Sequence, residues 1–264
     1  MSGALPLRQV AKPWGRAVLP TPFVAPAGER IGEIWFEPPT ELPELLVKYI
    51  FSSEKLSVQV HPSDAQRPGA GKEECWLILA ADPCATLGIG FREPLGPDAM
   101  RAAALDGSIE RLLDWHPVAA GDFFYIPANT VHAIGPGVSL IEVQQNSDVT
   151  YRLFDYGRPR ELHLDEAVAV AKGEPYRAEY RNRTQLGETT RLVAGPLFRL
   201  DQVTGASLEQ VAGDYAGAPL LVIPRNAPVL IGGESVDPGG CALARSLDEV
   251  ALSRNGTYLL AQPL

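Results

Sequence analysis

Frequent turn residues cut the chain into many short apolar runs, and this segmentation restricts the possible folds more than any other feature. The 264 residues include 25 Gly and 24 Pro, and the stretches between them are apolar or alternating over the length of a β-strand. The pattern predicts a mainly β protein. We expect strands at residues 45–51, 56–61, 74–80, 122–128, 139–145 and 150–154, and again at 197–203, 219–224, 227–232, 241–246 and 257–262.

Two segments carry helix signals instead. Residues 97–115 have Pro97 near a plausible start and Gly107 at a break, while residues 163–173 end at a glycine and contain Asp165 as a candidate N-cap. These signals predict a few short helices beside the strands.

A polar stretch separates two unequal parts of the chain. Residues 174–190 lack apolar periodicity, so we place a domain boundary near residue 185. The sequence predicts a larger domain over residues 1–184 and a smaller β-rich domain over residues 185–264. Both fit a β-barrel or a β-sandwich, because each contains many short strands without a fixed repeat.

Charge and composition exclude several classes of partner. The formal net charge is −9, and both nucleic acid and anionic membrane surfaces require a basic footprint, so we expect neither as a partner. A small anion can still bind where a few basic residues converge. The start of the chain lacks the apolar core of a signal peptide, and nowhere do about 18 apolar residues follow one another, so we expect a cytoplasmic protein.

The cysteines restrict the kind of metal site that the chain can build. Cys75, Cys84 and Cys241 are odd in number and show no C-x-x-C spacing. We therefore expect neither a disulfide framework nor a zinc–thiolate site. A bound metal would need nitrogen and oxygen ligands.

The predicted strand at residues 56–61 has two different faces. Its apolar residues alternate with Ser57, Gln59 and His61, because successive side chains in a strand point to opposite sides of a sheet. For a strand taken alone, a polar face turned to water is the ordinary interpretation. What this face meets depends on the other polar residues that the fold brings to it.

Further candidate ligands lie at two other strand ends. The period-two rule puts Lys72, Glu74 and Trp76 on one face, and His132 lies where a later strand runs into a turn. Two imidazoles, a carboxylate and the Gln59 amide form a credible ligand set for Zn²⁺ or another divalent ion, with the amide as the weakest ligand. Taken alone, each histidine would more often be a core or turn residue. We expect the remaining two, His116 and His163, to be structural or surface residues, because each lies in a polar context at a helix edge.

Several motifs resemble one enzyme family. The segment GDFFYIPANTVH follows the second cupin motif, with Asn129 where glycine is usual, and asparagine tolerates a positive φ. Four motifs in the same order resemble type I mannose-6-phosphate isomerase (phosphomannose isomerase), a member of the cupin superfamily. The resemblance covers roughly residues 10–172 well and the remainder loosely. The motifs are LSVQVHPSD (56–64), GKEECW (71–76), GDFFYIPANTVHAIG (121–135) and EVQQNSDVTYRLFDYGR (142–158).

This resemblance implies a fold, a reaction and a cofactor. The expected fold is mainly β, with a cupin-type β-barrel (jelly roll) catalytic half, a smaller cupin-like C-terminal half and few helices, because only twelve residues separate His61 from Glu74. The expected enzyme is a metal-dependent aldose–ketose isomerase that interconverts mannose 6-phosphate and fructose 6-phosphate through an enediolate. Its implied partner is a small sugar phosphate, and its implied cofactor is one Zn²⁺ per chain, held by Gln59, His61, Glu74 and His132.

The reaction assigns expected roles to further residues. It needs a base, an electrophile for the developing oxyanion and a clamp for the anion. The resemblance implies Arg152 and Lys72 as catalytic residues, and the planar guanidinium suits an enediolate or a phosphate. We predict Glu142 as the base, because it shares strand parity with Gln144. The predicted substrate-binding residues are Ser57, Arg158 and Asp148, with Arg158 a candidate for the phosphate.

Two other functions are compatible with the same residues. Two histidines and a carboxylate would also serve a non-haem Fe(II) oxygenase, although the glutamine ligand and the Arg152 motif count against it. A cupin that binds a sugar phosphate without turnover is the second alternative.

Overall fold

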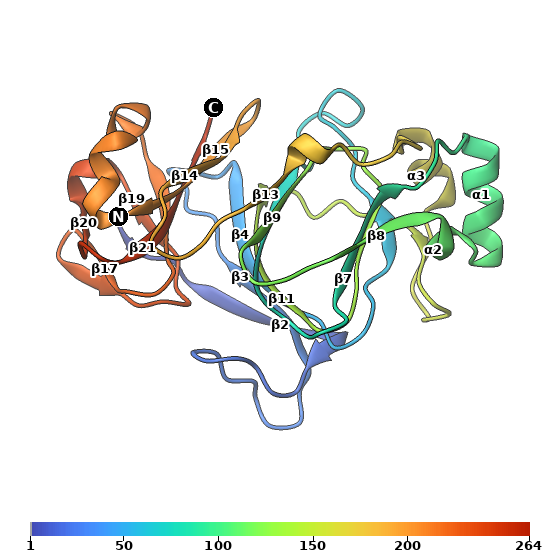
Figure 1. Ribbon diagram of the computed structural model, residues 1–264, viewed down its shortest axis with the longest axis horizontal. Coiled ribbons are helices and arrows are strands. Elements are labelled where there is room, and N and C mark those ends of the chain that lie inside the picture. Colours follow the sequence, from blue (N-terminus) through green and yellow to red (C-terminus); the bar gives the residue numbers. More distant parts are fainter. Residues whose placement is uncertain (1) are drawn as a thin grey trace.

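The computed structural model describes residues 2–264, and its antiparallel strands form four sheets (Figure 1). The two sheets that position the candidate site belong to the first two thirds of the chain. In spatial order, the seven-stranded sheet contains β13 (Arg181–Arg183), β9 (Asp122–Ile126), β6 (Glu74–Ala81), β11 (Val138–Gln145), β4 (Leu45–Phe51), β3 (Ile31–Phe36) and β2 (Leu7–Arg16). The five-stranded sheet contains β12 (Tyr151–Phe154), β5 (Val58–Val60), β10 (His132–Ile134), β7 (Thr86–Phe91) and β8 (Leu113–Pro117).

Two further sheets come mainly from the C-terminal part. The six-stranded sheet contains β1 (Gly3–Ala4), β19 (Ala242–Ala244), β16 (Leu220–Pro224), β21 (Thr257–Pro263), β15 (Phe198–Thr204) and β14 (Thr190–Ala194). The three-stranded sheet contains β18 (Glu234–Val236), β17 (Val229–Ile231) and β20 (Val250–Leu252). Strand β1 ties the start of the chain to this C-terminal sheet through its pairing with β19.

The seven-stranded sheet is buried on both faces. One face shares a core cluster with the five-stranded sheet, as Leu140 packs with Leu87. The other face shares a cluster with the C-terminal half, where Ile141 packs among residues such as Phe198. Burial on both sides explains why all seven residues of β4 are buried and why its sequence is almost continuously apolar. The two halves thus share a core, and the division near residue 185 stays a prediction.

Three short helices cover the outer face of the five-stranded sheet (Figure 1). They are α1 (Pro97–Asp106), α2 (Ile109–Leu112) and α3 (Leu164–Val170). Val58 and Val60 of β5 pack in the same cluster as Met100 of α1 and Ala167 of α3. Because side chains alternate along a strand, this contact turns Gln59 to the inner face. The polar face of this strand therefore points into the protein and not to water.

The helices and strands differ from the sequence expectations in detail. The segment 97–115 breaks at Gly107, whose φ of 78° ends α1, but residues from Leu113 onward form strand β8 and not helix. Helix α3 ends at Val170, and Asp165 lies in its first turn while His163 occupies the N-cap. Asn129 has a φ of 74°, as its place in the cupin motif predicts. Short 3₁₀ turns lie at Ala178–Tyr180, Gly205–Gln210, Ala212–Tyr215 and Leu247–Glu249.

The sequence expectations missed ten short or irregular strands of the described residues, which are β1, β2, β3, β7, β8, β10, β13, β14, β18 and β20. Within residues 2–264, no helix is long and apolar enough to cross a membrane.

Candidate metal centre and adjoining cavity

A cavity of about 270 Å³ lies between the seven-stranded sheet and the five-stranded sheet. Strands β4, β6 and β11 supply one wall, and β5, β10 and β12 supply the opposite wall. Three of the four tryptophans of the chain line it. The lining side chains that can carry charge are Lys12, Glu33, Lys48, Lys72, Glu142, Asp148, Arg152 and Arg160. A larger depression of about 510 Å³, near Arg16 and Arg30, contains none of these groups.

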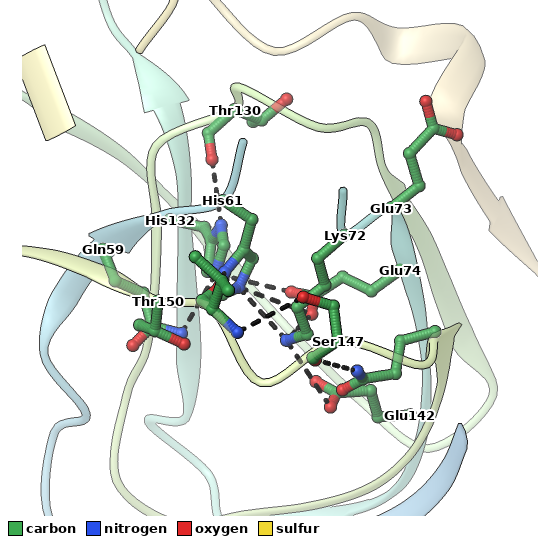
Figure 2. Close-up of polar contacts among 12 residues, drawn as sticks. Gln59, His61, Lys72, Glu73, Glu74, Thr130, His132, Glu142, Ser147 and Thr150 are labelled. Atoms are coloured by element: carbon green, nitrogen blue, oxygen red, sulfur yellow. Dashed lines mark hydrogen bonds and ion pairs between the residues drawn. The ribbon is translucent and has the colours of Figure 1, made fainter. Parts of the chain in front are cut away.

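Three buried side chains next to the cavity form a group that can hold a metal ion (Figure 2). The candidate ligand atoms of His61, Glu74 and His132 all lie within 4.8 Å of one another. His61 Nε2 is 3.6 Å from Glu74 Oε2, and His132 Nε2 is 3.4 Å from Glu74 Oε1. The structure thus brings together three of the four ligands that the sequence predicts, from the end of β5 and the beginnings of β6 and β10.

The hydrogen bonds of the two histidine Nδ1 atoms direct both Nε2 atoms toward Glu74, where Lys72 Nζ and Gln59 Nε2 contact them. His61 Nδ1 lies 2.7 Å from the Val149 carbonyl oxygen, and His132 Nδ1 lies 2.9 Å from that of Thr130. A carbonyl accepts only from a protonated nitrogen, so the proton sits on Nδ1 and the Nε2 lone pairs are left for a metal. Glu74 Oε1 is buried and makes no hydrogen bond within residues 2–264. An orphaned carboxylate oxygen facing imidazole lone pairs fits a bound divalent cation.

The surroundings also set the charge state of the group. Burial, and then the positive charge of Lys72, lower the pKa of His132 to about 4 and hold that of His61 well below its usual range. Burial raises the pKa of Glu74, against the opposing influence of Lys72. Both imidazoles are therefore neutral at pH 7, which is the form that binds metals.

Gln59 lies beside the metal group and is oriented by Ser57. Its position on β5 is paired with His132 on one neighbouring strand and with Arg152 on the other. Gln59 Nε2 lies 3.3 Å from His132 Nε2, and Ser57 Oγ donates to Gln59 Oε1 at 2.9 Å. Flipping the Gln59 amide group by about 180° would direct Oε1 toward the metal group and Nε2 toward Ser57, whose hydroxyl can also accept a hydrogen bond. Gln59 is thus placed to be the fourth ligand.

Lys72 connects the metal group to the rest of the cavity. It forms an ion pair with Glu74, and its Nζ lies 3.1 Å from His61 Nε2 and 3.9 Å from Glu142 Oε1. Burial lowers the pKa of Lys72, but the carboxylates of Glu142 and Glu74 outweigh this effect and raise it overall. Lys72 is therefore a charged, buried lysine that lines the cavity.

Sequence reasoning missed Lys48, a cavity residue on β4. Its Nζ lies 3.0 Å from Glu142 Oε1, bonds to the Gln144 side chain and lies 4.4 Å from the ring centroid of Trp35. The partnership follows from register, because Lys48 and Glu142 are paired residues of neighbouring strands. A single lysine inside the apolar run LLVKYIF was the available signal, since a buried lysine needs a charged partner.

Glu142 lines the cavity. Its side chain lies on the same side of β11 as that of Gln144, as their shared strand parity predicts, and both bond to Lys48. Its other oxygen, Oε2, accepts from Trp76 Nε1 at 2.9 Å. Burial raises the pKa of Glu142, but Lys48 and Lys72 outweigh it and lower that pKa to about 2. The carboxylate is deprotonated at neutral pH, as a base must be, but such a low pKa makes it a weak base. Glu142 as the catalytic base therefore stays a prediction.

Arg152 lies on β12 beside Gln59 and lines the cavity, as does the predicted substrate-binding residue Asp148. Arg158 is not among the lining residues, which departs from the expected contact with substrate. It bonds instead to Asp155 and Glu54, and the neighbouring Arg160 lines the cavity.

The two remaining histidines lie outside the metal group, as expected. His116 Nε2 is 3.5 Å from Asp114. His163 Nδ1 accepts from the backbone N–H of Arg152 at 3.2 Å and so helps to hold strand β12.

Comparison with known proteins gives both sequence relatives and structural neighbours. No family model matches the chain. A mannose-6-phosphate isomerase of Streptococcus mutans is 38% identical over 185 residues, which cover 65% of this chain and 58% of the relative. The mannose-6-phosphate isomerase ManA of Bacillus subtilis is 40% identical over 137 residues, or 48% of this chain and 43% of the relative. The alignments therefore span about half the length of these relatives.

The structural similarity extends over nearly the whole chain. The crystal structure of a mannose 6-phosphate isomerase from Bacillus subtilis aligns with a TM-score of 0.76 at 21% identity and covers 99% of both chains. A mannose 6-phosphate isomerase whose structure is described as bound with zinc and yttrium aligns with a TM-score of 0.68 at 16% identity, again over 99% of both chains. The mainly β, cupin-like fold predicted from the sequence is thereby confirmed. In sequence over 65% of its length, and in fold over almost all of it, the chain is similar to mannose-6-phosphate isomerases.

Proposed function

We propose that this protein is a metal-dependent aldose–ketose isomerase that interconverts mannose 6-phosphate and fructose 6-phosphate. The reaction comes from the names of the relatives, and the residues that carry it come from the cavity. The proposal includes the catalytic domain over residues 1–184, the cupin-like domain over residues 185–264 and a cytoplasmic location.

One observation carries the proposal: the metal group adjoins a cavity whose lining has a surplus of positive charge. Five cationic side chains and three carboxylates line this cavity, although the whole chain carries a net charge of −9. Such a local surplus favours a small anionic ligand. A sugar phosphate combines an anionic end with hydroxyl and carbonyl oxygens that a metal can polarise.

The proposed cofactor is Zn²⁺, one per chain. His61, Glu74 and His132 would hold it with Gln59 as the fourth ligand, because neutral imidazoles and a carboxylate are typical zinc ligands. When bound, zinc would act as a Lewis acid toward the oxygens at C1 and C2 of the open-chain sugar. Its presence in a solved neighbour supports this choice of metal.

The residues of the chain supply the remaining functions. Arg152 is proposed to stabilise the negative charge that develops on the enediolate, since its guanidinium has no ion pair within residues 2–264 and its position on β12 is paired with Gln59. Lys72 is proposed to hold Glu74 in place and to add positive charge at the reacting carbons. The Trp14, Trp35 and Trp76 side chains line the cavity and exclude water from the enediolate.

Proton transfer between C1 and C2 needs a base, and Glu142 is the proposed group. It lines the cavity and is deprotonated at neutral pH. Ser57 and Asp148 are proposed to bind sugar hydroxyls, because both line the same cavity and offer hydrogen-bond acceptors. Arg158, which the sequence predicts as a substrate contact, does not line the cavity, and we assign it no role in the reaction.

A coupled assay for conversion of mannose 6-phosphate to fructose 6-phosphate, with metal content measured on the same sample, tests the proposal. We expect turnover that follows zinc occupancy. A zinc-replete protein that binds the sugar phosphate without turning it over would instead be a binding cupin. Oxygen consumption with an iron-loaded sample would indicate the Fe(II) oxygenase, for which two histidines and a carboxylate also suffice.

A further inference from the structure

Two arginines that are two residues apart share one buried carboxylate but differ in what else they contact. Arg160 forms a fork with Asp155, with Nε 2.6 Å from Oδ2 and Nη2 2.6 Å from Oδ1. A guanidinium has five N–H donors, so about three of them are not used by the two hydrogen bonds to Asp155. Arg160 also lines the cavity between the seven-stranded and five-stranded sheets. Its orientation is thus fixed by Asp155 while donors remain for a ligand.

Arg158, by contrast, is occupied by groups of the protein. Its Nη1 donates to Asp155 Oδ1 at 3.2 Å, and its Nη2 donates to Glu54 Oε2 at 3.2 Å and to the Lys55 carbonyl oxygen at 2.9 Å. Two carboxylates already balance its charge. Because it does not line the cavity, Arg158 has neither the position nor the unpaired charge for a ligand there.

Arg152 provides a second positive charge close to Arg160. Within residues 2–264 its guanidinium makes no hydrogen bond or ion pair, and its Nε is buried without a partner. Burial lowers the pKa of Arg152, and the positive charge of Arg160 lowers it further, so the two guanidinium groups are close enough to repel. Asp155 is shared between Arg158 and Arg160, while Glu161 and Asp148 are the further acidic groups near Arg152.

We propose that Arg160 binds the phosphate group of the substrate, with Asp155 fixing the direction of its guanidinium. The inference rests on the proposed function for the identity of the ligand. A phosphate monoester carries a charge of about −1.5 to −2 at pH 7, which matches two neighbouring guanidinium groups. Arg152, which lies next to Gln59, faces the reacting carbons, while Arg160 sets the affinity for the anionic end.

The test compares Arg160→Ala with Arg158→Ala in the full-length, zinc-loaded protein. Three quantities are measured: KM and kcat for mannose 6-phosphate, and the affinity for inorganic phosphate by calorimetry. Losing hydrogen bonds to a charged group should raise KM and weaken phosphate binding about 10- to 100-fold in Arg160→Ala. KM and the phosphate affinity should stay within about fivefold of wild type in Arg158→Ala, because Arg158 does not line the cavity and its ion pair with the half-exposed Glu54 contributes little.

Further variants keep the comparison informative. Arg160→Lys retains the charge but not the fork, so its phosphate affinity should lie between those of wild type and Arg160→Ala. Thermal unfolding and zinc content show whether each variant is folded, and Arg160→Gln replaces Arg160→Ala where truncation unfolds the protein. A purely structural role for Arg160 would change the unfolding temperature and leave phosphate affinity unaltered.

The outcomes separate this inference from the proposed function. Normal KM and phosphate affinity in folded Arg160→Ala, with an active wild type, would overturn the inference and leave the isomerase assignment intact. Loss of affinity in Arg158→Ala alone would also overturn it and would favour the expectation from the sequence. If the wild-type protein binds inorganic phosphate through Arg160 but shows no isomerase activity, the anion site proposed here would stand and the isomerase function would be refuted.

Discussion

Replacing Lys48 by methionine removes the positive charge that is closest to Glu142, and we expect this change to destabilise the protein. Both side chains are buried, and Lys48 Nζ lies 3.0 Å from Glu142 Oε1. Methionine keeps most of the apolar length of the lysine side chain. The variant would therefore leave a buried carboxylate with fewer compensating contacts rather than an empty space.

The size of the effect follows from the pKa of Glu142. Its value in the folded protein is about 2, against 4.5 without the protein environment. At 1.36 kcal/mol per pKa unit, the environment stabilises the ionised form of Glu142 by about 3 kcal/mol, and Lys48 is the largest favourable contributor. Burial lowers the pKa of Lys48 itself, which offsets part of this gain. Breaking a buried ion pair typically costs about 3–5 kcal/mol. Since Trp76 and Lys72 remain near Glu142, we expect a loss of about 2–3 kcal/mol in the free energy of unfolding.

Denaturant unfolding at pH 7 of wild type, Lys48→Met, Glu142→Gln and the double variant measures this coupling. The double variant removes both charges, so it should recover more than half of the loss seen in Lys48→Met. The cost of Lys48→Met should also shrink as the pH falls. A carboxylate whose folded pKa is lowered contributes stability above its unfolded pKa, and this contribution is lost between about pH 4.5 and pH 2.

A loss below about 0.5 kcal/mol for Lys48→Met would refute this reasoning, because an exposed pair contributes that little. Additive effects in the double variant would refute it as well, since charges in direct contact must couple.

Three further predictions concern the candidate site. Chelation should abolish turnover, added Zn²⁺ should restore it, and His132→Ala should lose both metal and turnover; full activity in a verified metal-free sample would contradict the site. Arg152→Ala should lower kcat about 100- to 1,000-fold with zinc still bound, whereas a change confined to KM would make Arg152 a phosphate contact. Glu142→Gln should lower kcat severely with KM and zinc content little changed. Near-normal kcat in that variant would exclude Glu142 as the base, and Trp76→Phe, which removes only one hydrogen bond to the carboxylate, serves as its control.

The side-chain faces of the strands could be predicted from the sequence alone. Period two put Gln59 and His61 together, and Glu142 with Gln144, because alternation is a property of the extended backbone itself. The cupin motif likewise predicted the positive φ of Asn129. The motifs that resemble the isomerase family implied Gln59, His61, Glu74 and His132 as ligands before any contact was known, and the structure brings His61, Glu74 and His132 together.

What each face meets was decided by tertiary structure. Alternation alone would turn the polar side of β5 to water, but the helices cover the opposite side and direct Gln59 inward. The pairing of Lys48 with Glu142 joins residues 94 positions apart and depends on the register of two strands. Arg158 and Arg160 look equivalent in the sequence, and only the positions of Asp155 and Glu54 distinguish them. Local sequence fixes the direction of a side chain relative to its own backbone, whereas its partners are set by long-range packing, which no short segment encodes.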